Sequence, residues 1–415
     1  MRALYWLRND LRMHDNLALT HFATEAQVGL IIWCPSRSFM RAGRMRQEFI
    51  LASVLAFKHK IDSLGGAMLI CHELAETVLP KLIKQKNINT VFFSTEPTTE
   101  ELNEEIYLQA IPGIQCIAIS QGSLIQEENL PFTVDALPSV FTTFRIAVEK
   151  NLCIAAPLPI VKSLPEPIAN KDTDLSWDLD KTLQEAQYHP HIQPGEHAGL
   201  QRLNDYIFVQ DRLRVYKETR NGMIEWNDSS KLSPWLACGA LSPRQVYAAI
   251  RQYEETRCKN ESTYWLIFEL LWRDYFRFNA MKQRATLFNR VSPYTDNLSQ
   301  DKQRSLFQAW CSGTSPDAFI NANMRELNQT GWMSNRGRQN VASYLVKTLH
   351  VTWQWGADYF EKKLIDYDAA SNWGNWAYLA GVGQDPRDRI FDTKRQALRY
   401  DPMGVYQKKW LAIRD

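Results

Sequence analysis

The first 120 residues alternate between short apolar runs and longer amphipathic segments. The apolar runs are rich in β-branched and aromatic residues and predict strands at 3–7, 28–34, 67–73, 90–94 and 114–120. Two segments between them, 44–64 and 75–86, have the length and composition of helices, and the first stops at Gly65. Strands that alternate with helices predict a parallel, Rossmann-like sheet with helices on both faces. No GxGxxG follows the first strand, which disfavours a nicotinamide dinucleotide there.

The pattern changes after residue 155. Prolines recur with polar spacers from 157 to 194 and predict a connector. From about residue 200 the pattern is helical, and 264–284 is apolar on most faces, which predicts a buried helix. The segment 315–331 predicts a helix with a Ser cap, a Pro in its first turn and a Gly at its end. We expect three parts: an α/β domain at 1–130, a connector at 131–199 and an all-α domain at 200–415.

Composition is that of an ordinary soluble protein, with 45% hydrophobic and 23% charged residues. The net charge of +2 does not by itself argue for nucleic acid, although a local basic groove would be hidden in the sum. The seven cysteines stand singly, so neither a zinc site nor a disulfide framework is indicated, and a reducing, cytoplasmic setting is expected. The chain shows no apolar signal core and no run of membrane-spanning length, so no membrane association is expected.

Candidate chemistry is concentrated in the second half, where 11 of the 14 tryptophans lie after residue 200. The stretches 330–345 and 365–383, with the segment between them, combine cations, carboxylates, amides and tryptophans. These are Arg336, Arg338, Asp366, Asp368, Asn335, Gln339, Asn372, Trp353, Trp373 and Trp376. Buried charges are costly unless paired, and tryptophan is the ring most easily oxidised by one electron. The cluster therefore suggests a site for a polar, aromatic, redox-active cofactor, although a packed core with an ordinary turn would use similar residues.

Two further segments carry polar residues at helical positions. The hydroxyl-rich segment 227–243 could present N–H and hydroxyl groups to a phosphate, but it would also serve as a helix cap. In 268–278, Glu269 and Trp272 would give an acceptor and a stacking surface for a base. Glu269 and Arg273 are four residues apart and could instead simply pair. No Ser–His–Asp or Cys–His constellation stands out, so hydrolysis by a triad is not indicated.

Taken together, these motifs closely resemble the photolyase/cryptochrome family. The resemblance runs from residues 6–19 to 395–411 and covers nearly the whole chain. Its motifs are WLRNDLRMHDNLAL, SSKLSPWLACGALSPR, LLWRDYF, TGWMSNRGRQNVASYL and SNWGNWAYLAGVGQDPR. The resemblance implies an N-terminal α/β domain, a connector and an all-α domain that binds FAD in a bent, U-shaped form.

The resemblance also implies roles around the cofactor. The FAD phosphates would lie against Tyr216, Ser229, Ser230, Lys231, Leu232 and Ser233. Arg273 is expected at the cofactor too. Arg338 would pair with Asp366 beside the flavin ring. Asp368 would contact the polar edge of the ring, and Asn372 would face the flavin nitrogen that gains a proton on reduction.

The substrate side selects a branch of the family. By the resemblance, Glu269 would hydrogen-bond a pyrimidine lesion, Trp272 would pack against it, and Asn335 would lie on the substrate side of the flavin. Gln339 stands where pyrimidine-dimer photolyases carry Met, and Tyr378 where they carry Trp. These residues, with FTTFRIAVE and the SNWGNW motif, are typical of the cryptochrome-DASH branch. The (6-4) photolyases carry His at both positions 335 and 339, so that chemistry is disfavoured.

The branch implies light-dependent repair of cyclobutane pyrimidine dimers, chiefly in single-stranded DNA, by electron transfer from excited reduced FAD. It also implies a 5,10-methenyltetrahydrofolate antenna, with Glu96 at the position that holds the pterin. We therefore expect a monomeric carbon–carbon lyase that needs no metal. The alternative is a blue-light photoreceptor that signals without repair, which would not need Glu269 and Trp272. A dark flavin oxidoreductase lacks an evident nicotinamide site.

The resemblance is incomplete in the tryptophan chain that photoreduces FAD in this family. Trp376 and Trp353 match its proximal and middle members, but the distal position is Gln300. A tyrosine or another tryptophan, such as Trp310 or Trp355, would have to act as outer donor. The tail also departs from the family, with Asp392 where Asn is usual.

Overall fold

The computed structural model of the protein describes residues 1–169, 176–294, 298–383 and 390–412. Its contacts form two compact units. Unit 1 comprises residues 1–131, 152–205 and 232–252, and unit 2 comprises 132–151, 206–231 and 253–415. Part of the connector and the DPR end of the SNWGNW motif lie outside the described residues. The predicted boundaries at 130 and 200 stay a prediction, because each unit gathers several separate stretches of chain.

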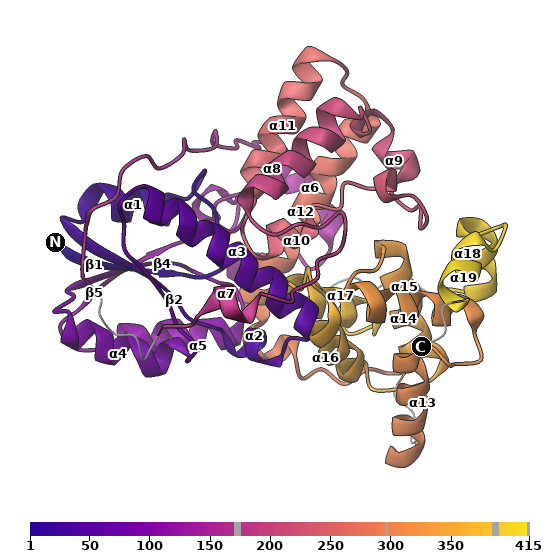
Figure 1. The fold of residues 1–415 in the computed structure, drawn as a ribbon. Coiled ribbons are helices and arrows are strands. Elements are labelled where there is room, and N and C mark those ends of the chain that lie inside the picture. Colours follow the sequence, from indigo (N-terminus) through magenta and orange to yellow (C-terminus); the bar gives the residue numbers. More distant parts are fainter. Residues whose placement is uncertain (170–175, 295–297, 384–389, 413–415) are drawn as a thin grey trace. The chain divides into compact units, whose positions relative to one another are not determined.

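Unit 1 contains a parallel sheet with strand order β3-β2-β1-β4-β5, and a short β6 pairs with β2. The strands are β1 (Arg2–Leu7), β2 (Val28–Trp33), β3 (Met68–Ile70), β4 (Thr90–Ser94), β5 (Gln115–Ile119) and β6 (Glu166–Pro167). The unit's longer helices are α1 (Leu17–Glu25), α3 (Arg44–Ser63), α4 (Ala75–Gln85), α5 (Thr99–Gln109) and α8 (Glu196–Asn204). Figure 1 shows α1 and α3 on one face of the sheet and α4 and α5 on the other. The predicted doubly wound sheet is confirmed.

The strands are buried on both faces, which explains why they read as continuous apolar runs. In β1, every residue after Arg2 is buried, and β4 is buried throughout. A strand covered by helices on both sides has no solvent face that would favour polar residues at alternate positions. One cluster of this core includes Leu4, Trp6, Ile32 and Phe93.

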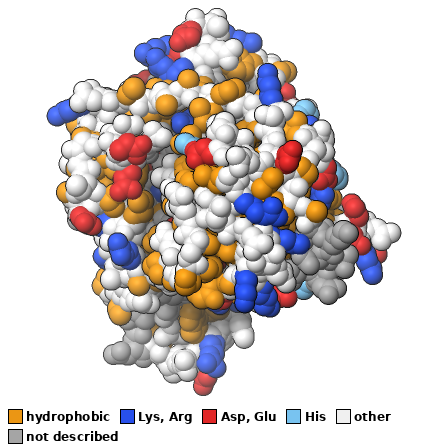
Figure 2. Space-filling view, turned by 90° about the vertical axis from the view of Figure 1, so that its left-hand side faces the viewer, with side chains coloured by type: hydrophobic (Ala, Val, Ile, Leu, Met, Phe, Trp, Pro, Cys, Tyr) orange, Lys and Arg blue, Asp and Glu red, His pale blue; other side chains and the backbone are white. Residues whose placement is uncertain are grey.

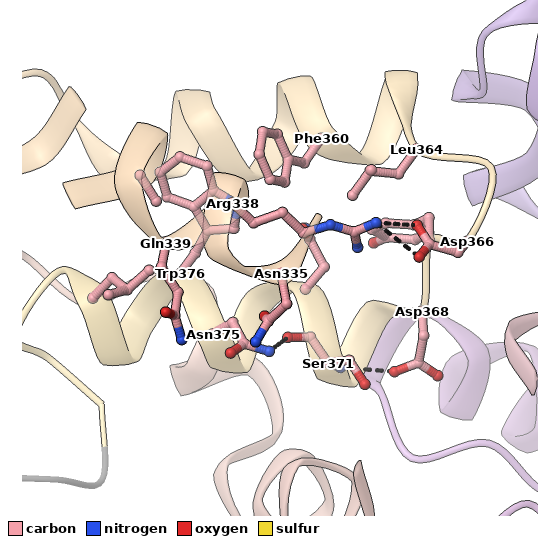
Figure 3. Close-up of a pocket in the computed structure, with 14 residues that line it drawn as sticks. Asn335, Arg338, Gln339, Phe360, Leu364, Asp366, Asp368, Ser371, Asn375 and Trp376 are labelled. Atoms are coloured by element: carbon pink, nitrogen blue, oxygen red, sulfur yellow. Dashed lines mark hydrogen bonds and ion pairs between the residues drawn. The ribbon is translucent and has the colours of Figure 1, made fainter. Parts of the chain in front are cut away.

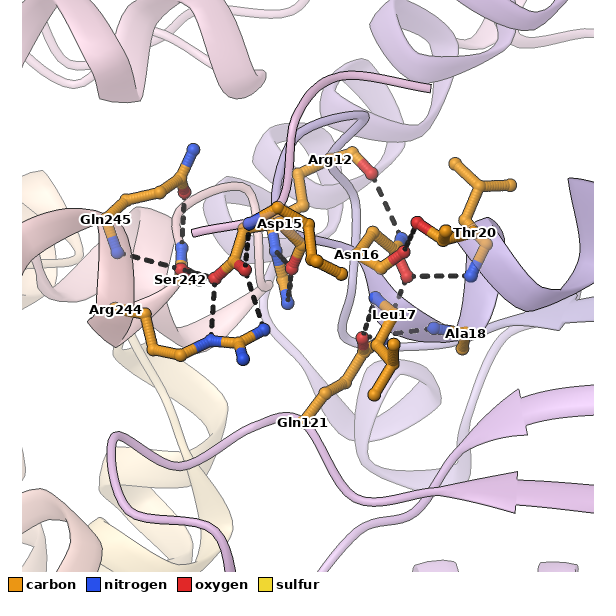
Figure 4. A network of polar contacts seen from close by, with 12 residues as sticks. Arg12, Asp15, Asn16, Leu17, Ala18, Thr20, Gln121, Ser242, Arg244 and Gln245 are labelled. Atoms are coloured by element: carbon orange, nitrogen blue, oxygen red, sulfur yellow. Dashed lines mark hydrogen bonds and ion pairs between the residues drawn. The ribbon is translucent and has the colours of Figure 1, made fainter. Parts of the chain in front are cut away.

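Buried polar contacts fix the loop after β1 to the segment 239–245 (Figure 4). Asp15 is fully buried and accepts hydrogen bonds from Ser242 and from Arg244, the latter at 3.0 Å. Arg12 donates to the carbonyl of Gly239 at 2.9 Å. Buried charges are stable only when they are paired and hydrogen-bonded. The charged residues of RNDLRMHDN, and the GALSPR part of the long Ser-rich motif, therefore have a structural role within unit 1.

Unit 2 is helical, as predicted. Its helices are α6 (Phe141–Glu149), α9 (Tyr216–Thr219), α12 (Glu261–Gln283), α13 (Gln300–Ser312), α14 (Ala318–Thr330), α15 (Asn335–Ser343), α16 (Trp353–Lys363), α17 (Ala369–Leu379), α18 (Thr393–Tyr400) and α19 (Val405–Leu411). The shorter α2 (Arg37–Arg41), α7 (Leu179–Thr182) and α10 (Ser233–Ala237) belong to unit 1, and α11 (Pro243–Thr256) runs from unit 1 into unit 2. A core cluster around Trp310, Trp353 and Trp376 joins α13 to α17.

Two sequence predictions need correction. The helix expected over 315–331 starts at Ala318, and its N-cap is Asp317, whose carboxylate accepts from the backbone N–H of Ile320 at 3.0 Å. Ser315 instead binds Asn321 and stands before the helix. The helix ends at Gly331 in the left-handed conformation, as predicted. The connector is also more structured than expected, because it contains α6, β6 and α7.

The described surface and helices offer no sign of a membrane segment or a metal cluster. None of the helices in the described part of the chain combines the length and the apolar character needed to cross a bilayer. The same residues contain no group of three or more metal-ligating side chains. On the face drawn in Figure 2, Lys and Arg are interspersed with Asp and Glu among apolar and neutral side chains, in keeping with the small net charge.

Candidate functional site

A cleft in unit 2, here called the helical cavity, lies among α15, α16 and α17 (Figure 3). It holds about 540 Å³ of space not filled by protein atoms, part of it open to solvent. Its lining residues are Asn335, Arg338, Gln339, Ala342, Phe360, Leu364, Asp366, Tyr367, Asp368, Ser371, Asn372, Asn375, Trp376 and Leu379. Apolar walls with a few converging polar groups are typical of small-molecule sites. The structure therefore brings together seven residues that the sequence marked: Asn335, Arg338, Gln339, Asp366, Asp368, Asn372 and Trp376.

The cation of the cavity, Arg338, is held in place by a backbone carbonyl just before α15 and by a buried carboxylate. Ser334 caps α15 by accepting from the N–H of Gly337 at 3.0 Å. Arg338 donates from Nε to the carbonyl of Met333 at 2.9 Å and from Nη2 to both oxygens of Asp366 at 3.0 and 2.8 Å. The Asp366 side chain is only 1% exposed, so this ion pair offsets part of the cost of burying its charge. The predicted pairing of these two residues is present.

The carboxylate of Asp368 is held in its ionised form at the start of α17. It caps the helix by accepting from the N–H of Ser371 at 2.7 Å, and Arg277 lies 3.7 Å away. Burial pushes the pKa of Asp368 upward, but the guanidiniums of Arg273 and Arg277 outweigh burial, and the pKa lies below its usual value. Asp368 can therefore accept a hydrogen bond from a ligand N–H at neutral pH.

Amide side chains complete the polar lining. Asn372 is buried, and its N–H donates to the carbonyl of Ala357 at 3.1 Å, which fixes the orientation of the amide. The Oε1 atom of Gln339 is buried and accepts no hydrogen bond from the residues that the structure describes. Buried acceptors without a partner are rare in folded proteins, so this atom indicates a donor supplied by a ligand. Asn335 is exposed at the first residue of α15.

Several lining residues were missed by the sequence analysis. Phe360, Leu364 and Leu379 form apolar walls, and Ser371 and Asn375 add polar groups. Six positions of α17 and its cap line the cavity at helical spacing: 368, 371, 372, 375, 376 and 379. That spacing is visible in DYDAASNWGNWAYL and could have identified Ser371 and Asn375. Phe360 and Leu364, which line the cavity from α16 and its C-cap, could not be identified in this way, because their sequence pattern is that of ordinary core positions.

The residues assigned to the lesion do not line the helical cavity. Glu269 of α12 forms an ion pair with Arg220, and not with Arg273 at the next helical turn. Burial raises the pKa of Glu269, and the charge of Arg220 offsets part of this rise. Trp272 stacks flat on Phe141 of α6, with ring centroids 3.7 Å apart and an interplanar angle of 12°. One face of Trp272 is therefore already covered by protein.

The segment assigned to the phosphates has an unusual backbone. Lys231 adopts a positive φ of 51°, which is uncommon for a residue with a side chain. Its ammonium lies 4.1 Å from the ring centroid of Trp332 and 5.3 Å from that of Trp226. Ser229 and Ser230 precede it in unit 2, whereas Leu232 and Ser233 belong to unit 1.

Cations upstream of that segment are already compensated. Tyr216 is buried at the start of α9. Lys217 forms an ion pair with Glu261, and Arg220 with Glu269. Because both cations are paired within the protein, they give little support to an anion site at 229–233.

A second cleft, here called the sheet-edge cavity, lies in unit 1 at the carboxyl ends of β1 and β2. It holds about 560 Å³ and is lined by Trp6, Arg8, Asn9, Leu11, Trp33, Cys34, Pro35, Ser36, Phe39, Ile50, Ala75, Glu101, Glu104 and Cys238. Glu96, the residue assigned to the antenna, is not in this lining. It follows β4 and accepts from Nδ2 of Asn9 at 3.1 Å.

Comparison with known proteins agrees with the observed fold. Two family models match: DNA photolyase over residues 3–166, and the FAD binding domain of DNA photolyase over residues 265–413. Cryptochrome DASH of Synechocystis sp. is 42% identical over 436 residues, covering 98% of this chain and 87% of that protein. Cryptochrome DASH, chloroplastic/mitochondrial, of Arabidopsis thaliana is 38% identical, covering 98% of this chain and 75% of that protein.

Solved structures give the same result. The crystal structure of Synechocystis sp. cryptochrome superposes with a TM-score of 0.92 at 42% identity, covering 99% of this chain and 88% of that one. A bacterial class III photolyase from Agrobacterium tumefaciens gives 0.85 at 27% identity, with 99% and 86% covered. The branch predicted from the motifs is confirmed. The chain belongs to the photolyase/cryptochrome family, in its cryptochrome DASH branch.

Proposed function

We propose that the protein is a deoxyribodipyrimidine photo-lyase that uses blue or near-UV light to split cyclobutane pyrimidine dimers, preferentially in single-stranded DNA. The observation that carries this proposal is the helical cavity. It places a fixed cation at Arg338, an ionised acceptor at Asp368 and an oxidisable ring at Trp376 around one open space. No hydrolytic or metal chemistry is needed for such a site.

The lining suits the flavin ring of FAD. That ring has apolar faces and one edge with alternating N–H and carbonyl groups. Phe360, Leu364 and Leu379 offer apolar contact, Asp368 can accept from a ring N–H, and Arg338 can donate to a carbonyl. The buried Oε1 of Gln339 offers a further acceptor. Because Ala357 holds the Asn372 N–H, the Asn372 oxygen is the atom we expect to face a protonated ring nitrogen.

When bound and reduced, FAD supplies the electron that light sends to the dimer and receives it again after the two cyclobutane C–C bonds have broken. The residues of this chain position the substrate and exclude water. Glu269 would accept a hydrogen bond from a base, and Trp272, supported from behind by Phe141, would offer its remaining surface for packing. The reaction has no net change in oxidation state, so these residues need not supply electrons to the lesion.

The strand preference follows from the cost of extruding the dimer. A duplex demands a few kcal/mol of unpairing and unstacking, most of which a single strand avoids. Gln339 and Tyr378 replace larger apolar contacts, so we expect the pocket to hold a flipped dimer less strongly. Each 1.4 kcal/mol corresponds to about a tenfold change, so single strands should be repaired at least about tenfold faster.

A repair assay on dimer-bearing oligonucleotides tests the proposal. Single-stranded and duplex substrates of one sequence are compared in light and in the dark, at matched salt because affinity depends on ionic strength. We expect repair only in light and faster repair of the single strand. Equal rates would contradict the strand preference, and absence of light-dependent repair would contradict the lyase itself.

We also propose that the protein acts as a monomer in the cytoplasm and carries a 5,10-methenyltetrahydrofolate antenna at Glu96. The carboxylate follows β4 and already accepts from Asn9, so it could accept from N–H donors of a pterin in the same place. Denaturation of the purified protein should release a folate as well as FAD. Release of FAD alone, from protein purified without folate loss, would contradict the antenna.

A photoreceptor that signals without repair is the second candidate, and the name cryptochrome carried by the relatives is the observation that favours it. The two functions differ at Glu269 and Trp272. A lyase requires them for its substrate, whereas a photoreceptor would respond to light equally well without them. Light-driven flavin reduction in wild type together with no repair of any dimer substrate would favour the photoreceptor.

A further inference from the structure

The family's electron route to the flavin cannot be complete in this chain. Its expected outer position is Gln300, the first residue of α13, which is exposed and has no ring. Its expected middle member, Trp353, has one ring contact among the described residues, with Trp373 at 5.6 Å. Trp373 in turn contacts Phe288 at 4.9 Å. This group therefore leads to Phe288, and no ring contact joins Trp353 to Trp376 within the described chain.

Trp376 has a different tryptophan against it. The rings of Trp376 and Trp310 meet edge to face, with centroids 6.2 Å apart and an interplanar angle of 74°. Trp310 is fully buried, and its indole N–H donates to the carbonyl of Val341 at 3.0 Å. A carbonyl is not a base, so Trp310 would keep its proton when oxidised and pass the oxidation on. Electron transfer between rings slows steeply with distance, which makes this contact the favoured first step.

From Trp310 the aromatic contacts continue toward solvent. Phe307 stacks on Trp310 at 5.8 Å and 19°, and Trp355 contacts Phe307 at 5.4 Å. Trp355 is half-buried, so oxidation that reaches it is accessible from solution. All four residues from Trp376 to Trp355 lie in unit 2.

Tyr359 also contacts Trp310, at 5.7 Å, but its chemistry is unsuitable. A phenol must lose its proton when it is oxidised at neutral pH. The hydroxyl of Tyr359 donates to Oδ1 of Asn328 at 2.5 Å, and an amide oxygen is too weak a base to take the proton. Burial also raises the pKa of Tyr359. Trp355 remains as the outer donor.

We propose that electrons reach the flavin along Trp355, Trp310 and Trp376, with Trp310 in the role that Trp353 has in the family's usual chain. The inference rests on the proposed function only in placing FAD in the helical cavity. Trp376 gives one electron to light-excited oxidised flavin. Trp310 then donates one electron to the oxidised Trp376, and Trp355 donates one electron to the oxidised Trp310 across the Phe307 ring. Trp355 then releases its indole proton to water. A thiol in solution returns a hydrogen atom to Trp355, and two thiyl radicals combine to a disulfide.

Photoreduction by a thiol under blue light tests the order of the relay. We expect Trp310→Phe and Trp355→Phe to lower the rate of flavin reduction by about tenfold or more. Trp353→Phe should cause a smaller loss. Trp33→Phe, in unit 1, is the matched control and should leave the rate unchanged. Flavin content and circular dichroism are measured for every variant, so that loss of the cofactor is not mistaken for loss of the relay.

The position of the oxidised residue gives a readout independent of the rate. Protein is illuminated without thiol, with ferricyanide to reoxidise the flavin, and oxidised tryptophan is located by peptide mass spectrometry against a dark control. We expect light-dependent oxidation at Trp355, abolished in Trp310→Phe. If Trp310→Phe does not fold, Trp355→Phe and the wild-type map decide the question.

Two results would overturn the relay. One is oxidation that accumulates at Trp353 or Tyr359 in place of Trp355. The other is full photoreduction in Trp355→Phe together with loss in Trp353→Phe. Both leave the proposed function intact. Wild-type protein without FAD would instead overturn the proposed function.

Discussion

The helical cavity and the sheet-edge cavity are both lined by tryptophan, arginine and carboxylates, and hold about 540 and 560 Å³ of space not filled by protein atoms, part of it open to solvent. They differ in what the polar groups bind. In the sheet-edge cavity, Arg8 donates to Glu104 at 3.3 Å, to Glu105, and to the carbonyl of Ser94 at 3.1 Å. Its donors are largely used by the protein itself.

The helical cavity is arranged differently. Its ion pair fixes the position of Arg338, but the buried acceptor of Gln339 has no partner among the described residues, and Asp368 is kept ionised. The residue types that line the two cavities therefore do not distinguish a cofactor site from an internal ion-pair network. The difference lies in polar groups that are buried and fixed yet still available to a ligand.

We expect the greatest difference between variants of the two cavity arginines, Arg338 in the helical cavity and Arg8 in the sheet-edge cavity. Arg338→Ala removes the guanidinium that donates to both oxygens of the buried Asp366, and removing one partner of a buried pair costs roughly 3–5 kcal/mol. We expect loss of FAD together with this loss of unfolding free energy. Arg8→Ala should also destabilise the protein while FAD content stays normal. Flavin-to-protein absorbance ratios and denaturant unfolding measure both effects. Equal flavin content in the two variants would remove the distinction between the cavities.

The next contrast is between tryptophans. Trp376→Phe should abolish or greatly slow photoreduction of oxidised FAD, because Trp376 lines the helical cavity and is the first member of the proposed relay. Repair by chemically pre-reduced protein should remain nearly intact, since repair draws on reduced flavin and not on the relay. Trp33→Phe changes a tryptophan of the sheet-edge cavity and is the control. Unchanged photoreduction kinetics in Trp376→Phe would show that another route dominates.

Glu269→Ala should lower repair while FAD content stays normal. A hydrogen bond to a charged group contributes about 1.5–3 kcal/mol, so the loss should be about tenfold to a hundredfold. Burial raises the pKa of Glu269, with Arg220 opposing. If the ionised form accepts from the lesion, repair should fall as the pH drops, beginning at a higher pH than for an ordinary glutamate. If repair by Glu269→Gln does not show this fall at low pH, the role of Glu269 as acceptor is supported. If wild type and Glu269→Gln have the same pH profile, that role is contradicted.

A last contrast concerns Glu101 of the sheet-edge cavity, whose effect is confined to stability at neutral and higher pH. Burial raises its pKa from an ordinary 4.5 to about 7. The carboxyl therefore binds its proton more tightly in the folded state, and stability falls as pH rises from about 4.5 to about 7. At 1.36 kcal/mol for each pKa unit, the loss is at most about 3 kcal/mol. Glu101→Gln should remove it, so the variant should melt higher than wild type at pH 8 and nearly equal at pH 5. Parallel melting curves at both pH values would contradict a buried, titrating Glu101.

The sequence predicted what depends on short-range pattern. The strand at 90–94 and the helix end at Gly331 follow from local composition. Two of the predicted polar lining residues, Asp368 and Asn372, stand one helical turn apart on α17 and its cap. Partners distant in sequence could not be read in this way. Arg220 competes for Glu269 from another segment, and the cap of α14 moved to Asp317 because Ser315 binds Asn321.

The available acceptor of Gln339 shows the same limit. Its residue type was marked by the family resemblance, but its lack of a hydrogen-bond partner emerges only when the surrounding helices are packed. Whether a buried polar atom is already satisfied is a property of the assembled site and not of the sequence around it.

The absorption spectrum of the purified protein, with the flavin released on heating quantified against protein, decides whether FAD occupies the helical cavity. We expect noncovalent FAD equimolar with the chain in wild type and in Arg8→Ala, and almost none in Arg338→Ala. A colourless wild-type protein that releases no flavin, or full flavin content in Arg338→Ala, would contradict the assignment of FAD to the helical cavity.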